Sequence, residues 1–359
     1  MVLMIIILPA GAGSRDSGDE FELIKAAEGL EHPWAIAFLP DGSLLVTERP
    51  GRLLHIAGSQ VREVSGLPKI HAEAQGGLLD IALHPEFHEN QLVYMTFSQS
   101  DCTGSGTALM RGVFNGEALE DIEILYRMPK FSRHGVHYGS RIVFAPDGTI
   151  YLTIGDRGER HRARDLLDAA GKTIRLNDDG SVPHDNPFVG HGDALNEIFS
   201  YGHRNSQGMA VHPETGAVWQ HEHGPRGGDE LNILVPGADY GWPLVSHGEE
   251  YSGGSVGIGT SAPGVTDPIT YWTPAVAPSG MTFYTGDAFS QWQGSLFIGS
   301  LVRTHLRRLE LSGNEVTAQE ILLSGEIGRI RDVREAPDGT LWLITDARNG
   351  ALYQMVPAK

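Results

Sequence analysis

One short phrase recurs along the chain and constrains the fold more than any other feature: an apolar run, a turn rich in Pro and Gly, and a second apolar run. The phrase occurs six times, at 33–49, 77–97, 139–156, 208–219, 280–299 and 330–346. The first, third and sixth copies carry the turn Pro-Asp-Gly. Pro presets φ in a turn, Gly supplies a positive φ, and the flanking runs are rich in strand-forming residues. Each copy is therefore predicted to be a β-hairpin.

The copies are about 45 to 75 residues apart, which leaves room for a four-stranded blade and its loops. Six such units predict an all-β fold, a six-bladed β-propeller in a single domain. The alternative is a two-sheet β-sandwich with coincidental turns. We expect the propeller domain to span 21–359 and to follow a separate N-terminal segment, 1–20. The only stretch with a helical pattern is 162–171.

Composition and charge exclude several classes of protein. With 40% hydrophobic and 20% charged residues, 46 Gly and 20 Pro, the chain is neither a disordered protein nor a helical bundle. A net charge of −18 argues against nucleic acid as a partner. Cys102 is the single cysteine, which rules out an intrachain disulfide and a cysteine-based metal site. Only five of the 27 basic residues are Lys, so most are Arg, whose planar fork suits carboxylates.

The N-terminal segment begins with a short apolar run, 1–8, followed by small residues. The run is too short to span a bilayer, so no membrane span is expected. It resembles the apolar core and cleavage site of a secretory signal, although no Lys or Arg precedes it. The start is therefore either truncated or an unusual mature N-terminus, and we expect a periplasmic or secreted protein.

Polar, Gly-rich loops interrupt the strand pattern and carry candidate catalytic residues. His137 is a candidate general base, because imidazole titrates near neutral pH, and Asp229 is a candidate to hold its far nitrogen. Arg204, Arg329 and Arg331 are candidate carboxylate clamps. Strand alternation puts Arg329 and Arg331 on one face, which is costly unless an anion sits between them. The alternative is a pair of surface salt bridges.

Two kinds of metal site are also compatible with these loops. Glu230 and Tyr240 lie near Gly224 and Pro225, and carboxylate and carbonyl oxygens suit calcium. Histidine pairs at 221 and 223, and at 134 and 137, could instead hold a transition metal. Sixteen histidines in the chain make such close pairs common by chance.

Taken together, the loop phrases resemble the soluble aldose sugar dehydrogenases, PQQ-dependent six-bladed propellers also called glucose/sorbosone dehydrogenases. The resemblance covers about residues 30–355. It rests on the joint occurrence of His-Tyr-Gly-Ser-Arg, Gly-His-Arg-Asn-Ser-Gln-Gly, Glu-His-Gly-Pro-Arg-Gly-Gly-Asp-Glu-Leu-Asn, Asp-Tyr-Gly-Trp-Pro and Arg-Ile-Arg-Asp-Val.

The resemblance implies pyrroloquinoline quinone (PQQ) and Ca²⁺ as cofactors and assigns roles to individual residues. It implies His137 as the catalytic base. It implies contacts with PQQ from Gln75, Arg204, Asn205, Tyr251, Arg329 and Arg331. It implies calcium at PQQ on the carbonyls of Gly224 and Pro225, and a structural calcium at Glu230 and Tyr240. Some members carry a Lys where this chain has Val302, and the neighbouring Arg303 is a candidate substitute.

The implied reaction is oxidation of an aldose at C1 to the aldonolactone. His137 would remove the proton of the anomeric hydroxyl while hydride passes from C1 to the calcium-polarised quinone, and Asp229 would stabilise the imidazolium. Electrons would leave to an external acceptor, and the enzyme is expected to be a monomer or homodimer. A calcium-dependent lactonase and a binding propeller without chemistry are the alternatives. The arginine pairs favour a planar polyanionic ligand over a neutral sugar alone.

Overall fold

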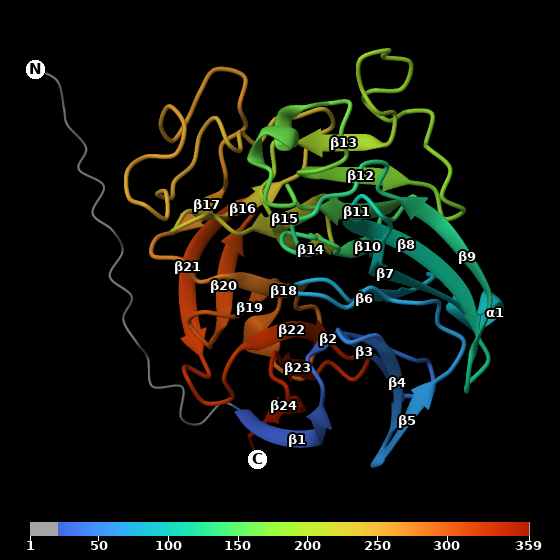
Figure 1. The fold of residues 1–359 in the computed structure, drawn as a ribbon. Coiled ribbons are helices and arrows are strands. Elements are labelled where there is room, and N and C mark those ends of the chain that lie inside the picture. Colours follow the sequence, from blue (N-terminus) through green and yellow to red (C-terminus); the bar gives the residue numbers. More distant parts are fainter. Residues whose placement is uncertain (1–20, 359) are drawn as a thin grey trace, which may run out of the picture.

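The computed structural model describes residues 21–358 as six four-stranded antiparallel sheets arranged around a central axis (Figure 1). This arrangement confirms the predicted six-bladed β-propeller and excludes the two-sheet sandwich. The segment 1–20, predicted to precede the domain, lies outside the described residues. No helix within residues 21–358 is long and apolar enough to cross a membrane.

The first three blades follow one another along the chain. Blade 1 comprises β2 (Pro33–Phe38), β3 (Leu44–Glu48), β4 (Arg52–Ala57) and β5 (Gln60–Val64). Blade 2 comprises β6 (Leu78–Leu83), β7 (Leu92–Ser100), β8 (Ser105–Phe114) and β9 (Leu119–Arg127). Blade 3 comprises β10 (Ile142–Phe144), β11 (Ile150–Ile154), β12 (Lys172–Leu176) and β13 (Ile198–Tyr201).

The remaining blades complete the ring. Blade 4 comprises β14 (Ser206–Val211), β15 (Val218–Glu222), β16 (Asp229–Ile233) and β17 (Thr270–Trp272). Blade 5 comprises β18 (Pro278–Phe283), β19 (Leu296–Ser300), β20 (Leu306–Ser312) and β21 (Glu315–Leu322). Blade 6 comprises β22 (Ile330–Glu335), β23 (Leu341–Thr345), β24 (Gly350–Pro357) and β1 (Phe21–Leu30).

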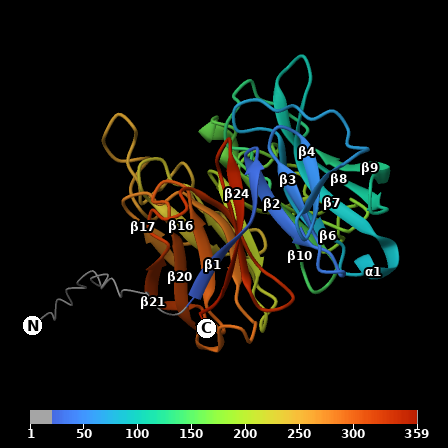
Figure 2. The same ribbon diagram turned by 90° about the horizontal axis from the view of Figure 1, so that it is seen from below.

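Blade 6 closes the ring by combining both ends of the described chain. Its outer strand, β1, pairs antiparallel with β24, from Phe21 opposite Pro357 to Leu30 opposite Gly350. Figure 2 shows these two strands side by side. Closure of this kind leaves few exposed strand edges.

The six repeated phrases form the first two strands of the six blades, as predicted. In the complete copies the turn Gly has φ between 78° and 84°, a left-handed conformation that Gly adopts without strain. The turn Asp accepts the N–H of the residue after that Gly, as Asp147 does from Thr149 at 3.0 Å. The inner strands are almost fully buried and pack between neighbouring blades, for example Leu45 and Met95 in one cluster. The phrase thus encodes both the turn and the core.

The helical prediction for 162–171 is wrong for most of its length. A 3-10 helix, η1 (Arg160–Arg164), is followed by turns, and the other short helices are α1 (Phe87–Asn90) and η2 (Ser290–Trp292). Lys172 supplies the physical reason. Its buried ammonium donates to the carbonyls of Arg162, Ala163 and Ala170 at 2.7–3.0 Å. The first two of these carbonyls would otherwise accept bonds from the next helical turn.

Candidate functional site

A cavity of about 320 Å³ lies where the first strands of the six blades converge, and we call it the axial cavity. Residues from all six blades contribute to its lining, in or next to their first two strands. Four of the predicted cofactor contacts line it: Gln75, Asn205, Arg329 and Arg331. The propeller thus brings together loops that are up to about 250 residues apart in the chain.

His137 lies beside this cavity, because it precedes Tyr138 and Gly139, which line it, although His137 itself is not a lining residue. Its Nδ1 lies 2.7 Å from Asp156 Oδ1, and its backbone N–H donates to Gln75 Oε1 at 2.8 Å. The side chain is 17% exposed, so the imidazole retains access to solvent. Because the carboxylate accepts the proton on Nδ1, Nε2 remains as the basic nitrogen.

Asp156, which sequence reasoning missed, is the carboxylate that orients His137. It is buried at the end of the third repeat, and it also accepts from Gly158 N and from Trp242 Nε1, both at 2.8 Å. Although burial raises the pKa of Asp156, the hydrogen bonds from His137 and Gly158 bring it below the ordinary value. A charged Asp156 is thus available to stabilise a protonated imidazole.

The prediction that Asp229 holds His137 is wrong. Both oxygens of Asp229 are bonded to backbone N–H groups: Gly224 N at 2.9 Å, and Val276 N and Ala277 N at 2.7 Å. Burial raises the pKa of Asp229 above the usual range. Its carboxylate therefore ties the loop after β15 to the segment before β18, and does not orient the imidazole.

Burial lowers the pKa of His137 below its ordinary value of 6.5, and the hydrogen bond that His137 donates to Asp156 opposes that shift. The imidazole is therefore neutral at neutral pH, as a general base requires. The backbone here is strained, because His137, Ser140 and Arg157 have φ of 54°, 80° and 60°. Each such conformation costs about 1–3 kcal/mol and persists only where surrounding contacts impose it.

Arg157 supplies several of those contacts. It is fully buried, lies 3.4 Å above the ring of Tyr138, and donates to the carbonyls of Val136 and, at 2.9 Å, His134. The sequence signal for it was the run Gly-Asp-Arg-Gly at 155–158, directly after a repeat strand.

Arg329 and Arg331 share one face, as predicted, and the anion between them is Asp346. Arg329 Nη2 and Arg331 Nη2 each lie 2.8 Å from Asp346 Oδ2. Burial raises the pKa of Asp346, but the two guanidinium groups outweigh it and hold that pKa well below the usual range. One carboxylate offsets only one of the two positive charges, and the buried Arg331 Nε has no hydrogen-bond partner.

Arg204, Asn205 and Tyr251 lie together beside the cavity. Arg204 donates to the carbonyl of His223 at 3.1 Å and to the hydroxyl of Tyr251 at 3.3 Å, while its Nε is buried without a partner. Asn205 Oδ1 accepts from Gly139 N and Gln207 Nε2. Tyr251 is 71% exposed, so it lies at the rim rather than in the wall.

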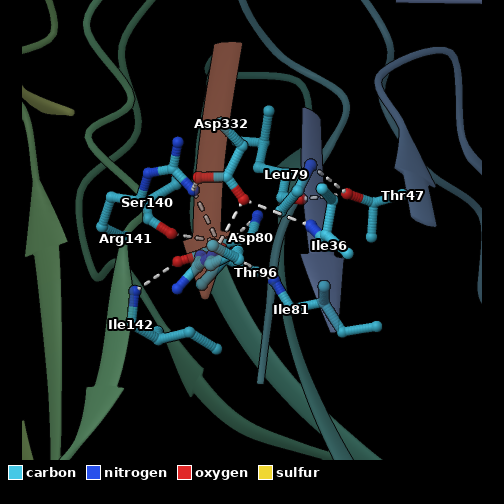
Figure 3. Close-up of polar contacts among 12 residues, drawn as sticks. Ile36, Thr47, Leu79, Asp80, Ile81, Thr96, Ser140, Arg141, Ile142 and Asp332 are labelled. Atoms are coloured by element: carbon cyan, nitrogen blue, oxygen red, sulfur yellow. Dashed lines mark hydrogen bonds and ion pairs between the residues drawn. The ribbon is translucent and has the colours of Figure 1, made fainter. Parts of the chain in front are cut away.

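A buried charge network supports the floor of the axial cavity. Figure 3 shows Arg141 reaching toward Asp80 and Asp332, whose carboxylates each lie 3.1 Å from its Nη1. Arg141 also donates to the carbonyls of Gln207, at 2.7 Å, and Arg331, at 3.1 Å. Both acceptors line the cavity. The network therefore fixes the backbone at Gln207 and Arg331, whose side chains line the cavity.

None of the predicted calcium ligands lines the cavity, although Gly224 directly follows His223, which does. Within residues 21–358, no group of three or more His, Cys, Asp or Glu is placed to hold an ion. His223 Nε2 is hydrogen-bonded to the carbonyl of Pro278 at 2.6 Å, and both ring nitrogens of buried His221 lack partners. The histidine pairs thus do not converge on a transition-metal site.

Val302, at the position where family members carry Lys, lines the axial cavity. Arg303 does not line it, and its Nε donates to the carbonyl of Ala275 at 3.3 Å. The expectation that Arg303 replaces the missing Lys is therefore wrong. The side chains of adjacent residues at the end of a strand point to opposite sides.

Comparison with known proteins agrees with this geometry. Residues 30–354 match the family model described as Glucose / Sorbosone dehydrogenase. The chain belongs to this family. The resemblance inferred from the loop phrases is thereby confirmed, and so is the prediction of an oxidoreductase.

Members of the glucose/sorbosone dehydrogenase family resemble this chain over nearly its whole length. Aldose sugar dehydrogenase YliI of Escherichia coli (strain K12) is 42% identical, over 91% of each chain. The apo crystal structure of the soluble aldose sugar dehydrogenase from Escherichia coli has a TM-score of 0.91 at 40% identity, covering 94% of this chain and 99% of that one. The PQQ-bound aldose sugar dehydrogenase from Streptomyces coelicolor has a TM-score of 0.76 at 29% identity, covering 93% and 98%.

Proposed function

We propose that this protein oxidises aldose sugars at C1 to aldonolactones, with PQQ as cofactor and an external electron acceptor. The observation that carries the proposal is an axial cavity with surplus guanidinium charge, beside which a buried carboxylate holds a neutral imidazole. The PQQ-bound structure of a family member supports the choice of cofactor. The apolar run at residues 1–8, which resembles the core of a secretory signal, supports a periplasmic or secreted location.

The residues of the cavity fit PQQ, a planar quinone with three carboxylates. Together, Arg329 and Arg331 carry one positive charge that Asp346 does not offset. The Nε atoms of Arg331 and Arg204 are buried donors without an acceptor. Bidentate arginine–carboxylate pairs are strong and geometrically specific. Gln75 and Asn205 add neutral polar groups at the same cavity, whose volume of about 320 Å³ is in the range of small-molecule sites.

Calcium fits the neighbouring loop in a similar way. Among the hydrogen bonds of residues 21–358, none is accepted by the carbonyls of Gly224 or Pro225, and such oxygens suit calcium. At the second proposed calcium position, Glu230 lies opposite Glu222 across β15 and β16. Burial and that neighbour raise the pKa of Glu230, a cost that a divalent cation would relieve. The hydroxyl of Tyr240 is bonded to Ile233 and Val235, which leaves its carbonyl as the available ligand.

When bound, PQQ supplies a calcium-polarised quinone that accepts hydride. The chain's own residues do the acid–base work. His137 Nε2 removes the proton of the anomeric hydroxyl, and the negative charge of Asp156 stabilises the imidazolium that results. The bonds from Gly158 and Trp242 hold Asp156 in place, and the bond from His137 to Asp156 orients the imidazole.

The proposal is tested by dye-linked oxidation of D-glucose, with phenazine methosulfate as acceptor, by apo-protein given PQQ, calcium, both or neither. Activity is expected only with both. His137→Ala should lower turnover by about 10²- to 10⁴-fold, the usual contribution of a general base, without loss of PQQ binding. His134→Ala, an exposed histidine of the same loop, is the matched control and should stay active.

Two results would count against the dehydrogenase. One is failure of PQQ to bind, together with inactivity toward several aldoses. The other is survival of turnover in His137→Ala. Lactone hydrolysis would then be measured next, because a calcium-dependent lactonase needs neither the quinone nor the arginine clamps.

A further inference from the structure

A second concave site lies on the other side of the segments that carry Val302 and Ala277. It is a groove of about 530 Å³ between the edge of blade 4 at β17 and strands β20 and β21 of blade 5, which Figure 1 shows side by side. Tyr271, Trp272, Arg303, His305 and Arg307 line it. We call it the Trp272 groove.

The charge of the Trp272 groove is opposite to that of the protein. Its lining includes two arginines, Arg303 and Arg307, and no acidic side chain, in a chain of net charge −18. Burial lowers the pKa of His305, which also lines the groove, to about 4, so this imidazole is neutral at neutral pH. Neither Arg303 nor Arg307 forms an ion pair with any carboxylate in residues 21–358. Arg303 is exposed and uses only Nε within the protein, so its two terminal nitrogens are available.

Arg307 is the more buried of the two arginines. It donates to Gln319 Oε1 at 2.7 Å and lies 3.4 Å from His305 Nε2, and its own Nε has no partner. Burial lowers the pKa of Arg307 to about 10, so it remains charged at neutral pH. A buried cation without a counter-ion is costly, and an anion in the groove would relieve that cost.

Two aromatic side chains line the groove, of which Tyr271 is 49% exposed and Trp272 only 6% exposed, so the accessible ring is that of Tyr271. Arg307 lies over the ring of Trp272 at 5.6 Å, and Trp272 Nε1 donates to the same Gln319 oxygen at 2.9 Å. Tyr271 is half exposed and stacks on His247, with ring centroids 3.9 Å apart. Aromatic and guanidinium groups at one site suit a planar ring that carries a negative charge.

The groove and the axial cavity share a thin wall. Leu301, Val302 and Ala277 line the cavity, whereas Val276 and Arg303 line the groove. The two segments are joined by hydrogen bonds from Leu301 N to Ala277 O, 3.0 Å, and from Val302 N to Val276 O, 3.3 Å. A molecule in the groove is therefore separated from the cavity by two adjacent backbone segments.

We propose that the Trp272 groove binds a planar aromatic anion, and that this ligand is the electron acceptor. The second part rests on the proposed function. An acceptor of the quinone or indophenol class takes two electrons and two protons from the reduced enzyme and leaves in its two-electron-reduced form, while the enzyme returns to its oxidised form. The arginines hold the negative group, and the accessible ring of Tyr271 packs against the ring of the ligand.

Binding is tested first, on apo-protein without PQQ or sugar. The probes are 2,6-dichlorophenolindophenol, a planar anionic redox dye, and naphthalene-2-sulfonate, a planar anion that accepts no electrons under these conditions. Calorimetric titration should show both binding at one site, more weakly as salt is added. Arg303→Gln and Arg307→Gln should each weaken binding about tenfold, the loss of one charge-assisted hydrogen bond.

The control variant is Arg62→Gln, which removes the same charge from an exposed position on β5. It should bind both probes as the unaltered protein does. Absence of binding, or equal weakening in all three variants, would overturn the groove as a ligand site. The side chain of Arg303 makes only one hydrogen bond within the protein, so its variant is expected to fold.

The acceptor role is tested on the enzyme loaded with PQQ and calcium. Arg303→Gln should raise the KM for the indophenol about tenfold. The KM for the sugar, and the rate with phenazine methosulfate, a cationic acceptor, should not change. An unchanged KM for the indophenol in a variant that has lost probe binding would overturn the acceptor role. Inactivity of the unaltered protein with both acceptors would instead count against the proposed dehydrogenase, because probe binding does not depend on it.

Discussion

Asp156→Asn removes one charge from the site without changing the shape of the side chain. Asp156 Oδ1 accepts from His137 and Gly158, and Oδ2 accepts from Trp242, at 2.7–2.8 Å. The amide of Asn has only one oxygen. It can accept either from His137 and Gly158 or from Trp242, and its NH₂ group then faces the remaining donor. Since Asp156 is fully buried, the unsatisfied pair costs about 1–3 kcal/mol of unfolding free energy.

The effect on turnover follows from the bond to His137. A hydrogen bond to a charged partner contributes about 1.5–3 kcal/mol. The bond between His137 and Asp156 is strongest when His137 is an imidazolium, because both partners are then charged. Losing it at the transition state lowers kcat about 10- to 150-fold. Binding of PQQ should persist, because the arginines that would hold it are not bonded to Asp156.

The pH profile separates an orienting carboxylate from a merely structural one. Burial already lowers the pKa of His137, and the hydrogen bond that His137 donates to Asp156 opposes that shift. A general base works unprotonated, so activity falls as the pH drops through that pKa. Removing the carboxylate charge lowers the pKa further, so the acid limb moves to lower pH while the plateau falls. A structural defect would lower the plateau alone.

The assay is kcat for an aldose across the acid side of neutrality, with enzyme reconstituted with PQQ and calcium and phenazine methosulfate as acceptor. Asp229→Asn is the matched control, because Asp229 is equally buried but bonded only to backbone N–H groups. It should lower stability and leave the acid limb in place. A normal kcat and acid limb in Asp156→Asn, or a displaced limb in Asp229→Asn, would refute the reasoning.

Three further outcomes are expected. Arg141→Met should destabilise the protein by about 3–5 kcal/mol in denaturant unfolding, because it leaves the two buried carboxylates of Asp80 and Asp332 with a single cation, Arg334, between them. Arg331→Gln should weaken PQQ binding to the apo-protein about 10- to 100-fold by calorimetry, through loss of a partly orphaned guanidinium. Burial lowers the pKa of Lys172 from 10.5 to about 7, so the unfolded chain binds more protons between these values. Stability should therefore rise with pH across that window in urea titrations, and Lys172→Met should flatten the rise.

The propeller could be predicted from the sequence because each repeat carries its own turn and its own buried strands. In the phrase around Pro40, Asp41 and Gly42, the turn chemistry and the apolar alternation point to the same hairpin. The helical pattern at 162–171 failed for the opposite reason. Its carbonyls are bound by Lys172, a residue outside the pattern, and no local propensity reports such a contact.

The candidate site was predictable in its residue types and less so in its pairings. Arg329 and Arg331 lie on one strand face, so alternation was sufficient to place them together. Which carboxylate meets His137 depends on how loops from blades 3 and 4 converge. Asp229 belongs to one of the loop phrases that resemble the family, whereas Asp156 does not. The fold nevertheless brings Asp156 Oδ1 within 2.7 Å of His137 Nδ1. The same applies to Arg303, whose direction follows from the path of the loop after β19.

The order in which the blades are synthesised has a consequence for maturation. The strand β1 is made first and finds its partner, β24, only after every other blade exists. Arg329, Arg331 and Asp346 belong to that last-completed blade, so three of the four charged side chains that line the axial cavity belong to the blade that closes the ring. The emerging chain therefore has no finished site in which to capture a small anion. Closing the ring is the checkpoint after which the protein becomes competent to load its cofactor.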